Sequence, residues 1–561
     1  MPIKRRDNLK KIFDNIFKEL GYENNTRIIT SNNADFQCDD LFKLAKTYHK
    51  SPIEIGNEVV QKINSLNNFS VYFKEVTFSK PGFININVSD EYINTELNEL
   101  MNKDILGAEK QNKKIILDYG GPNVAKPLHV GHLRSAIIGQ AINNILKFVG
   151  NETLADVHLG DFGLQMGQVI YGILHDFDNP KEAIIDLNYL NETYPKISAL
   201  CKEDESIKNE CLNITKELQN GNEEYKALWQ KIYDVSVNDI KSIYNYLSVN
   251  FDLWLGESDS YKYFDELFKK LESKNVLKED DGAKIIEVAE KEDKIQVPPC
   301  IVQKTDGAYL YATSDLATIY HRKKDYQPDN IIYITDNRQS LHFTQVFRAA
   351  KKSEIYKGTL EHYGFGTVNG KDNKPFKTRT GGTMKLKDLI EEVKHEFLSM
   401  REENKNMSEE DIDIIVNAII KFADLQNDLE RNYIFDIKKF SEVNGKTGPY
   451  ILYTYLRINK LIENSNQPLS NNIYSNTDRQ LRLKLLEVSD VINEAAKQRK
   501  PHFIAGYLYD LCTVANNFYQ NNRVIGLEGI KKSDFEALLN FNNKVIKNLL
   551  GLLSINIPTK M

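Results

Sequence analysis

Residues 115–150 constrain the fold more than any other stretch, because they have the pattern of a strand, a glycine turn and a helix. Residues 115–117 form a short apolar run, as expected of a buried strand. Residues 120–122, Gly-Gly-Pro, break that run. From Leu133 onward apolar residues recur at helical spacing until Gly150, which favours a left-handed helix end. The stretch therefore predicts one strand–turn–helix unit of an α/β domain.

Two histidines flank a glycine where this helix is expected to begin, in the order His129-Val130-Gly131-His132. Free backbone N–H groups and the helix dipole make a helix N-terminus a binding site for anions. Gly131 allows close approach to the backbone, and both imidazoles can donate hydrogen bonds to phosphate oxygens. Four residues alone fit two histidines beside a helix cap equally well. Their position directly after a strand favours a phosphate site.

Bulk composition indicates a multidomain globular protein of the cytoplasm. The 561 residues suffice for roughly three or four domains, and no run of about 18 apolar residues predicts a membrane span. The N-terminus lacks the apolar core of a secretory signal. The five cysteines are scattered, without Cys-x-x-Cys, which argues against a disulfide framework or a cysteine zinc site. The net charge of −6 excludes a globally basic nucleic-acid binder but leaves room for a local basic face.

The segments on either side of this unit give a coarse organisation. Residues 1–95 predict a small α+β unit with an amphipathic helix over 9–20, a helical run over 40–66 and a strand pair turning at 80–82. After Gly150 a second strand and glycine turn follow, where Asp161 and Gln165 are expected to face a cleft. Residues 176–300 are expected to be a mostly helical insertion.

Residues 301–350 carry a second set of candidate site residues. Tyr311 and Asp315 are four residues apart, which places them on one face of a helix. A strand at 331–334 then leads into a helix with Gln339 and His342 at its entrance. Because parallel βα units place ligand groups at the carboxyl ends of their strands, both turns are expected to line one crevice.

A basic, glycine-containing loop follows, with Lys377 and Arg379 beside Gly381 and Gly382. Such a loop either clamps a triphosphate or is a solvated turn. From Lys385 onward the chain is expected to be all helical. The aromatic and basic residues Tyr450, Tyr453 and Arg457 lie near one helical face there, which suits stacking on unpaired bases as well as core packing.

Four separated strings give the chain a family resemblance. PGFINI, PNVAKPLHVGHLRSAI, the Tyr450-x-x-Tyr453-x-x-x-Arg457 pattern and KPHFIA-x-YL occur in this order. Together they resemble class I aminoacyl-tRNA synthetases, most closely arginyl-tRNA synthetases. The resemblance implies a multidomain fold with an N-terminal α+β tRNA-binding domain, a Rossmann-like catalytic domain with helical insertions, and an all-α anticodon-binding bundle. We expect these at residues 1–100, 110–400 with the insertion near 176–300, and 441–561, joined by a helical connector at 401–440.

The resemblance also implies a two-step reaction. Arginine attacks the α-phosphorus of ATP to give arginyl-adenylate, and the terminal ribose of tRNA(Arg) then accepts the arginyl group. The expected partners are L-arginine, ATP with Mg²⁺, and tRNA(Arg). No protein metal site and no membrane partner are expected, and the protein is expected to be a cytoplasmic monomer.

Site residues follow from the same resemblance. Arginine contacts are expected at Asp118, Asn123, Tyr311, Asp315 and Gln339. Carboxylates suit a guanidinium, which makes Asp118 and Asp315 the candidate acids, while Asn123 and Gln339 suit the amino-acid head group. Transition-state stabilisation is expected from His129, His132, Lys126, Lys377 and Arg379. The expected ATP-binding residues are Pro122, Asn123, Val124, Ala125, Lys126, Pro127, Leu128, His129, Val130, Gly131, His132 and His342, and the expected tRNA contacts are Tyr450, Tyr453 and Arg457.

One motif departs from the family pattern. The second class I signature, Lys-Met-Ser-Lys-Ser, is replaced by KTRTGGTMKL, with no serine and second lysine in register. Arginyl-tRNA synthetases include this variant, in which a lysine before the histidine motif substitutes, and Lys126 fills that position. The division of labour between Lys126, Lys377 and Arg379 therefore stays open.

Without the family resemblance, the residue patterns support a narrower conclusion. They indicate an α/β nucleotidyltransferase with a His-x-Gly-His phosphate site and a long helical tail. A small-molecule adenylyl or cytidylyl transferase would not need that tail. Another class I enzyme, cysteinyl-tRNA synthetase, is disfavoured by the absence of cysteine zinc ligands. A non-catalytic tRNA-binding paralogue is disfavoured by the intact His129, His132, Asp118 and Asp315.

Overall fold

The computed structural model describes residues 6–31, 33–305, 307–371, 373–374, 376, 384–462 and 467–561. The chain forms two compact units. The first unit contains the chain up to residue 110 together with residues 450–498 and 503–550. The second contains residues 111–449, 499–502 and 551–561. Among the described helices, none is both long and apolar enough to cross a membrane.

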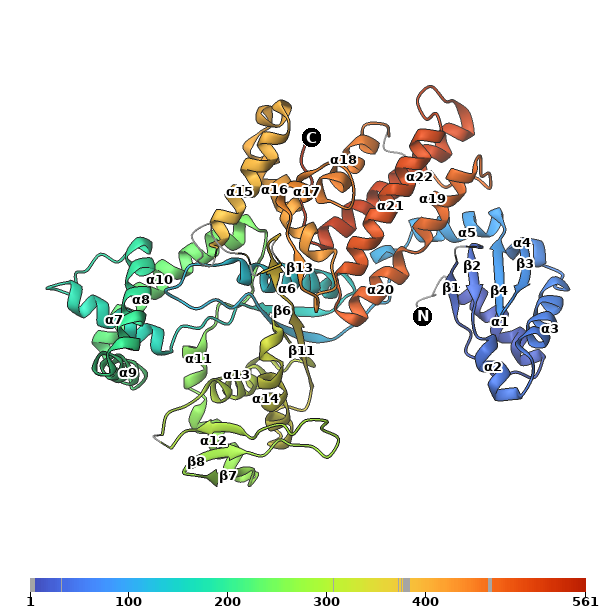
Figure 1. Cartoon of the computed structure of the whole chain (residues 1–561). Helices are drawn as coiled ribbons and strands as arrows, with labels where there is room; N and C mark the ends of the chain where they lie inside the picture. The colour runs from blue at the N-terminus through green and yellow to red at the C-terminus, as the bar shows by residue number, and fades with distance from the viewer. Residues whose placement is uncertain are drawn as a thin grey trace. The chain divides into compact units, whose positions relative to one another are not determined.

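The N-terminal part of the first unit is an antiparallel sheet with strand order β1-β2-β4-β3, packed by helices α1, α2 and α3 (Figure 1). The predicted strand pair at 73–88 is confirmed. The helical run expected over 40–66 is confirmed, but it is divided into two helices because Ser51 caps a new helix that begins at Pro52. The elements are α1 Arg6–Glu19, β1 Ile28–Thr30, β2 Phe36–Cys38, α2 Leu41–Tyr48, α3 Pro52–Asn64, α4 Phe69–Tyr72, β3 Phe73–Ser79, β4 Phe83–Val88 and α5 Asp90–Met101.

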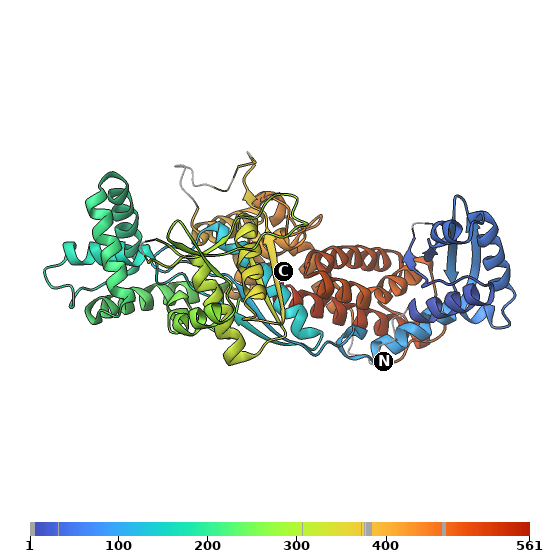
Figure 2. The ribbon, with the colours of Figure 1, turned by 90° about the horizontal axis from the view of Figure 1, so that it is seen from below.

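A bundle of five helices makes up most of the rest of this unit, and Figure 2 shows them running side by side in orange and red. Arg482 on α19 is buried and donates to Asp478 at 2.7 Å and to Asn94 on α5 at 2.6 Å. Because a buried charge is costly unless paired, these contacts fix α19 against α5. The helices are α18 Gly448–Asn459, α19 Asn476–Leu486, α20 Val488–Gln498, α21 His502–Asn521 and α22 Gly529–Leu552.

The second unit is built on a parallel sheet with strand order β11-β10-β5-β6. The two βα units predicted from the sequence supply its centre, and β5 is buried along nearly its whole length, as expected of a central parallel strand. Helix α6 connects β5 to β6, and α13 and α14 pack with the other strands over an apolar core. The elements are β5 Lys114–Tyr119, α6 Val130–Phe148, β6 Glu152–Asp156, α13 Tyr311–Tyr326, β10 Asn330–Asp336, α14 Ser340–Lys352 and β11 Thr359–Phe365.

The insertion is helical only in part. Its first four helices, between residues 164 and 246, stand together at one end of the second unit, drawn in teal and green (Figure 2). The prediction of a mostly helical segment is wrong after residue 276, where a three-stranded antiparallel sheet of order β7-β8-β9 forms. Asp281 and Gly282 both have positive φ at the tip of its first hairpin, a turn for which Asp-Gly is a known signal. The elements are α7 Leu164–Asp176, α8 Leu187–Glu203, α9 Glu205–Gln219, α10 Glu223–Tyr246, α11 Glu257–Tyr261, α12 Phe264–Ser273, β7 Leu277–Asp280, β8 Ala283–Ile286 and β9 Cys300–Gln303.

Helices dominate the second unit after residue 385, with one exception to the all-helical prediction. Strand β13 pairs in parallel with the short β12. The elements are β12 Val368–Asn369, α15 Leu386–Met400, α16 Glu409–Leu425, β13 Tyr433–Ile434 and α17 Ile437–Ser441, and the 3₁₀ turns of the chain are η1 Asp104–Gly107, η2 Asn337–Gln339 and η3 Glu402–Asn406.

A buried ion pair joins α6 to α16. Arg134 Nε lies 2.9 Å from Asp424 Oδ2, and both side chains are 1% exposed. Arg134 also donates to the carbonyls of Gly366 at 2.7 Å and Arg431 at 3.1 Å. The helix that begins with the histidine motif is thereby held against the segment that follows the sheet.

We predict that Arg134→Met strongly destabilises the second unit, because the Asp424 carboxylate would stay buried without its cation. Removing one partner of a buried pair costs about 3–5 kcal/mol, whereas removing both is often near neutral. Calorimetric unfolding should therefore show a large drop in midpoint for Arg134→Met and recovery in the double variant with Asp424→Leu. A single variant as stable as the parent would contradict this account of the pair.

Candidate active site

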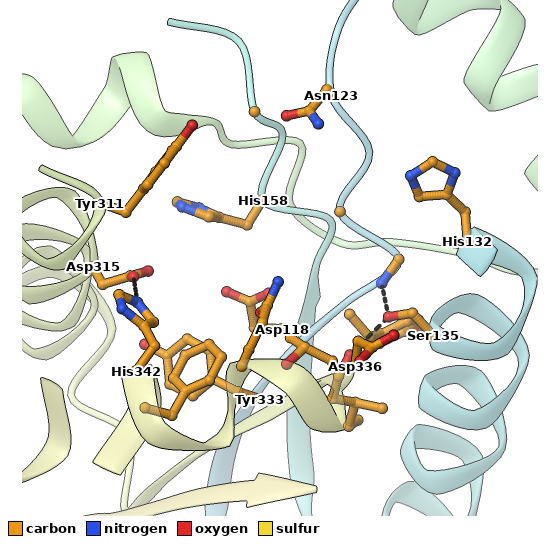
Figure 3. A pocket seen from close by; sticks show the side chains of 18 of the residues that line it. Asp118, Asn123, His132, Ser135, His158, Tyr311, Asp315, Tyr333, Asp336 and His342 are labelled. Carbon is orange, nitrogen blue, oxygen red and sulfur yellow. Dashed lines mark hydrogen bonds and ion pairs between the residues drawn. The ribbon is translucent and has the colours of Figure 1, made fainter. Parts of the chain in front are cut away.

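A pocket of about 550 Å³ lies at the carboxyl edge of β5, β6 and β10. This is the edge at which parallel α/β sheets bind ligands. In Figure 3, His132 and Ser135 lie on one side of the pocket, Tyr311, Asp315 and His342 lie on the other, and Asp118 and His158 lie between. Nine predicted residues line it together: Asp118, Asn123, His129, Gly131, His132, Tyr311, Asp315, Gln339 and His342.

The glycine turn after β5 is fixed on both sides. Gly120, at φ +72°, donates its N–H to Ser135 Oγ at 2.7 Å, and Ser135 donates to the Ile334 carbonyl of β10 at 2.7 Å. A Cβ on Gly121 would lie 2.6 Å from the His158 carbonyl oxygen. Glycine is therefore needed at both positions, one for its backbone conformation and one for close approach.

Backbone hydrogen bonds set the tautomers of the two histidines. The Gly131 N–H donates to His129 Nδ1 at 3.0 Å, and the His129 N–H donates to His132 Nδ1 at 3.1 Å. A ring nitrogen that accepts a hydrogen bond carries no proton, so the proton of each neutral imidazole lies on Nε2. The rings pack together with centroids 3.8 Å apart. Each ring thus has an Nε2–H donor available for a ligand.

Both histidines are neutral at pH 7. Burial, with smaller contributions from the neighbouring His129 and Lys126, lowers the pKa of His132 to about 3. Burial, with Lys126 and Arg338, also lowers the pKa of His129. These side chains therefore act as hydrogen-bond donors rather than as cations.

The histidine motif pairs with the segment that follows the basic loop. Val130 donates to the Met384 carbonyl at 3.1 Å, and Leu386 donates to the Leu128 carbonyl at 2.9 Å. The C-terminal end of that loop is therefore held beside His129. Lys377 and Arg379 lie outside the described residues. Lys126 Nζ lies 4.5 Å from the centroid of the Tyr194 ring.

The far side of the pocket is acidic. Tyr311 and Asp315 stand on one face of α13, which confirms the predicted helix, and Tyr311 is 67% exposed. His342 Nε2 lies 2.5 Å from Asp315 Oδ2. Gln339 in η2 is exposed and lines the pocket, as does Asn123.

A buried arginine lies behind the centre of the pocket. Arg322 is fully buried, and its Nη2 donates to Asp118 and to Asp156, each at 2.6 Å. Asp118, Asp156 and His158 offer ligand atoms within 4.8 Å of one another, a grouping that could hold a metal ion. Arg322 already supplies the positive charge there, so the grouping does not fit a metal. Two carboxylates share one cation, which leaves a net negative charge.

Sequence reasoning missed Arg322, His158 and Glu257. Glu257 begins α11 and lines the pocket, and burial raises its pKa to about 7, with Asp161 and Asp315 adding to the rise and His158 opposing it. Nothing near Glu257 or Arg322 in the sequence marks them, because they join the site only through the fold. His158 follows the end of β6, the position at which site residues of a parallel sheet are expected, so it could have been found.

The expectation that Asp161 and Gln165 face the cleft is wrong. Asp161 accepts hydrogen bonds from Ser258, at 3.0 Å from its N–H and 2.6 Å from its hydroxyl, and thereby fixes the start of α11. Gln165 donates to the Gly160 carbonyl at 3.2 Å. Asp161 thus positions the helix that carries Glu257 instead of lining the pocket.

Several predicted ATP-binding residues do not line the pocket. Gly160 pairs with the backbone of Pro122 and Val124, at 3.0 and 2.9 Å. This pairing holds the loop that presents Asn123. The side chains outside the lining are Pro122, Val124, Ala125, Lys126, Pro127, Leu128 and Val130.

The predicted tRNA contacts lie in the first unit, on α18. Arg457 packs on the ring of Tyr519 of α21, with its guanidinium carbon 4.2 Å from the centroid. The Tyr450 ring lies 5.7 Å from that of Tyr509, and Tyr453 is 40% exposed. These side chains form an aromatic and basic face, which is called the α18 face below.

Known families match nearly the whole chain. Residues 96–437 match the catalytic domain of class I (R) tRNA synthetases, residues 451–561 the DALR anticodon binding domain, and residues 6–88 the arginyl-tRNA synthetase N-terminal domain.

Individual relatives agree with these matches. The chain is 42% identical to an arginine–tRNA ligase of Alkaliphilus oremlandii over 98% of both chains, and 39% identical to one of Francisella tularensis over 99% of both. Arginyl-tRNA synthetase from Plasmodium falciparum has a TM-score of 0.84 at 26% identity and covers 100% of this chain and 99% of its own. The Thermus thermophilus enzyme shares the fold, with a TM-score of 0.79 at 20% identity over 99% of this chain and 100% of its own. The chain therefore belongs to the arginyl-tRNA synthetase family of class I aminoacyl-tRNA synthetases.

Proposed function

We propose that this pocket activates L-arginine with ATP, and that the enzyme then transfers the arginyl group to the 3′ end of tRNA(Arg), releasing AMP and diphosphate. Arginine–tRNA ligase is the activity that the names of its curated relatives give them. One observation carries the proposal: the pocket has neutral hydrogen-bond donors at a helix N-terminus on one side and half-buried carboxylates on the other. An anionic triphosphate and a cationic amino acid need these opposite surroundings.

The histidine side binds the phosphates of ATP. Negative charge grows on the α-phosphate oxygens when the arginine carboxylate attacks. The Nε2–H donors of His129 and His132 and the N-terminus of α6 stabilise that charge without reorganising. Mg²⁺ bound to ATP offsets part of the phosphate charge, and no protein metal site is needed for it.

Lysine and arginine side chains add positive charge to the histidine side of the pocket. Lys126 lies close enough to both histidines to lower their pKa values. Residues 128–130, paired with residues 384–386, bring the end of the basic loop beside the same histidines. We assign Lys126, Lys377 and Arg379 jointly to the phosphates.

The acidic side binds the arginine side chain. Asp315 and Glu257 reach the pocket from α13 and α11, and Tyr311 lies one helical turn before Asp315. A guanidinium presents a planar fork of five donors, which carboxylates accept in pairs. Burial raises the pKa of Glu257 to about 7, and a substrate cation beside this carboxyl would favour its charged form.

Asp118 suits the α-ammonium group better than the guanidinium. It lies between the two sides of the pocket, where the backbone of a bound arginine must sit for its carboxylate to reach the α-phosphate (Figure 3). Burial raises the pKa of Asp118 while Arg322 opposes the rise. The single negative charge left by Asp118, Asp156 and Arg322 matches one ammonium. Asn123 and Gln339 flank this head group.

The α18 face contacts tRNA. Tyr450, Tyr453 and Arg457 combine stacking surfaces with a cation, the combination that binds unpaired bases and the phosphate backbone. The DALR anticodon binding match covers these residues except Tyr450, which directly precedes its start.

We further propose that the enzyme works as a monomer in the cytoplasm, without a membrane partner. All five cysteines are free and buried, which fits a reducing compartment. Sedimentation equilibrium tests the oligomeric state.

We predict that Asp315→Asn raises the KM for arginine far more than the KM for ATP. Loss of a buried charge pair costs about 2–5 kcal/mol, roughly a 30-fold or larger rise. Citrulline, which has nearly arginine's shape but no charge, should be rejected by roughly 10⁴. ATP–pyrophosphate exchange in the presence of tRNA measures both, with the exposed Asp265→Asn as matched control. Unchanged arginine kinetics, or ready activation of citrulline, would show that the pocket is misassigned.

We predict that His132 stays neutral, with the proton on Nε2, from pH 8 down to pH 5, and that His129 is neutral in the same tautomer at pH 7 to 8. Their lowered pKa values and the two Nδ1 acceptor bonds are the reason. Nitrogen-15 spectra of histidine-labelled enzyme report the tautomer directly, and His129→Gln and His132→Gln assign the signals. An imidazolium signal from His132 near pH 6, or from His129 at pH 7 to 8, would rule out the neutral-donor role.

We predict that Arg457→Gln and Tyr453→Ala both weaken tRNA binding but differ in their salt dependence. Removing a phosphate-contacting cation should reduce the slope of log affinity against log salt by about 1. Removing a stacked ring should leave the slope unchanged but weaken the binding free energy by about 1–3 kcal/mol. Binding titrations at several salt concentrations give both numbers. Parent-like affinity in both variants would place the tRNA elsewhere.

A further inference from the structure

His342 makes one of the shortest side-chain contacts in the pocket, and its partner is the residue assigned to the substrate guanidinium. Its Nε2 lies 2.5 Å from Asp315 Oδ2, and His342 is 31% and Asp315 18% exposed. Figure 3 shows the imidazole between Asp315 and the ring of Tyr333. An imidazole here therefore occupies one of the carboxylate oxygens that a guanidinium would use.

The neighbours of His342 leave Asp315 as its one close acidic partner. The Phe343 ring packs edge-on to His342 at 5.3 Å and stacks on His362 at 4.7 Å. Burial, together with His342, lowers the pKa of His362 to about 4, so His362 stays neutral. The titratable or charged groups near His342 on the elements around it include Asp315 and Tyr311 on α13, Glu257 on α11, His362 on β11, Cys300 on β9, Tyr333 on β10, and Arg338, paired with Asp336, at η2.

We propose that His342 is a positioning residue for arginine: as an imidazolium it neutralises Asp315 in the empty site, and it gives up one proton when the substrate guanidinium arrives. The proposal rests on the assignment of Asp315 to the guanidinium. It differs from the expectation that His342 binds ATP.

The proton balance is simple. In the empty site the protonated ring donates its Nε2–H to Asp315. When the guanidinium pairs with Asp315, two positive charges would face one carboxylate, so Nδ1 releases its proton to the solvent buffer. Nε2 keeps its proton and still donates to Oδ2, which holds the carboxylate in the same orientation in both states. No other bond is made or broken.

The surroundings of the pair favour this exchange. Burial opposes charge on the ring, but the hydrogen bond and charge of Asp315 raise the pKa of His342, which favours the imidazolium when Asp315 has no other cation. Bound arginine pairs with Asp315 and thereby removes the effect of this carboxylate on the pKa of His342. A ligand without a positive charge, such as citrulline, leaves His342 charged and must compete with it for the carboxylate.

Glu257 complicates a bulk measurement of proton release. Its pKa of about 7 means that it also loses a proton when a cation binds. The test must therefore observe the His342 ring itself. Selective histidine labelling in a deuterated background gives ten imidazole signals, one for each histidine of the chain, and His342→Gln identifies the signal of interest.

The full-length enzyme at pH about 6.5, near the ordinary histidine pKa, is titrated with L-arginine and separately with citrulline. The His342 signal should move from the imidazolium to the neutral position with arginine and should not move with citrulline. The exposed His395 should not move with either ligand. A His342 signal that stays neutral throughout, or stays charged at saturating arginine, overturns the proposal.

The steady-state kinetics of two His342 variants distinguish a positioning role of this side chain from a packing role. Glutamine places an amide N–H near the position of Nε2 but cannot titrate, so His342→Gln should keep the arginine KM within a few-fold at pH 8 and flatten its fall between pH 6 and 8. His342→Ala should raise the arginine KM at least tenfold at every pH, with the ATP KM little changed. His395→Gln is the matched control.

Two results distinguish a failure of the His342 proposal from a failure of the arginine-site assignment. If Asp315→Asn alters arginine kinetics while His342→Gln shows the parent's pH profile, the arginine site stands and the His342 proposal fails. If Asp315→Asn leaves arginine kinetics unchanged, the site assignment itself fails. If His342→Ala raises the KM for ATP but not the KM for arginine, His342 binds the nucleotide and the positioning proposal fails.

Discussion

The buried contact of Arg322 with Asp118 and Asp156 organises the second unit and its pocket. Arg322 lies near the end of α13, and its two partners end the neighbouring strands β5 and β6. Loss of one partner of such a pair costs about 3–5 kcal/mol, so the helix is held firmly to the strand ends. Tyr311 and Asp315 lie at the other end of the same helix. The contact that anchors α13 thereby fixes where the guanidinium-binding side chains stand.

The same contact sets the electrostatics of the pocket. One arginine shared by two aspartates leaves the centre negative, and Asp315 and Glu257 extend that character to one side. On the opposite side the histidines are kept uncharged by burial and carry their protons on Nε2. A cationic amino acid and an anionic nucleotide can then occupy one cavity, each facing complementary groups. Their reacting ends meet between the two sides, near Asp118.

The parts of the site that sequence reasoning found are those with local signals. The strand, glycine turn and helix of residues 115–150 and the four-residue spacing of Tyr311 and Asp315 depend only on neighbouring residues, and the structure has both. Glu257 reaches the pocket from an insertion, and Arg322 lies behind the pocket at the far end of a helix, so only the tertiary fold reveals them. Asp161 was predicted for the cleft from its turn, but its partner Ser258 lies 97 residues away.

The secondary structure shows the same difference between elements with local sequence signals and elements that depend on distant contacts. The parallel sheet and the N-terminal strand pair followed from apolar runs and turn residues. The β7-β8-β9 sheet was missed because its strands are only four residues each and β7 is largely charged, and only the Asp281-Gly282 turn signalled a hairpin. Charge composition favoured helix there, and pairing with β9 decided otherwise.

The orientation of arginine in the pocket is the central claim, and an experimental structure of the enzyme with L-arginine and a non-hydrolysable ATP analogue tests it most directly. We expect the guanidinium at Asp315 and Glu257, the ammonium at Asp118, and the α-phosphate within hydrogen-bond distance of Nε2 of His129 or His132. An arginine bound the other way round, with its guanidinium at Asp118, or bound outside this pocket, would contradict the account.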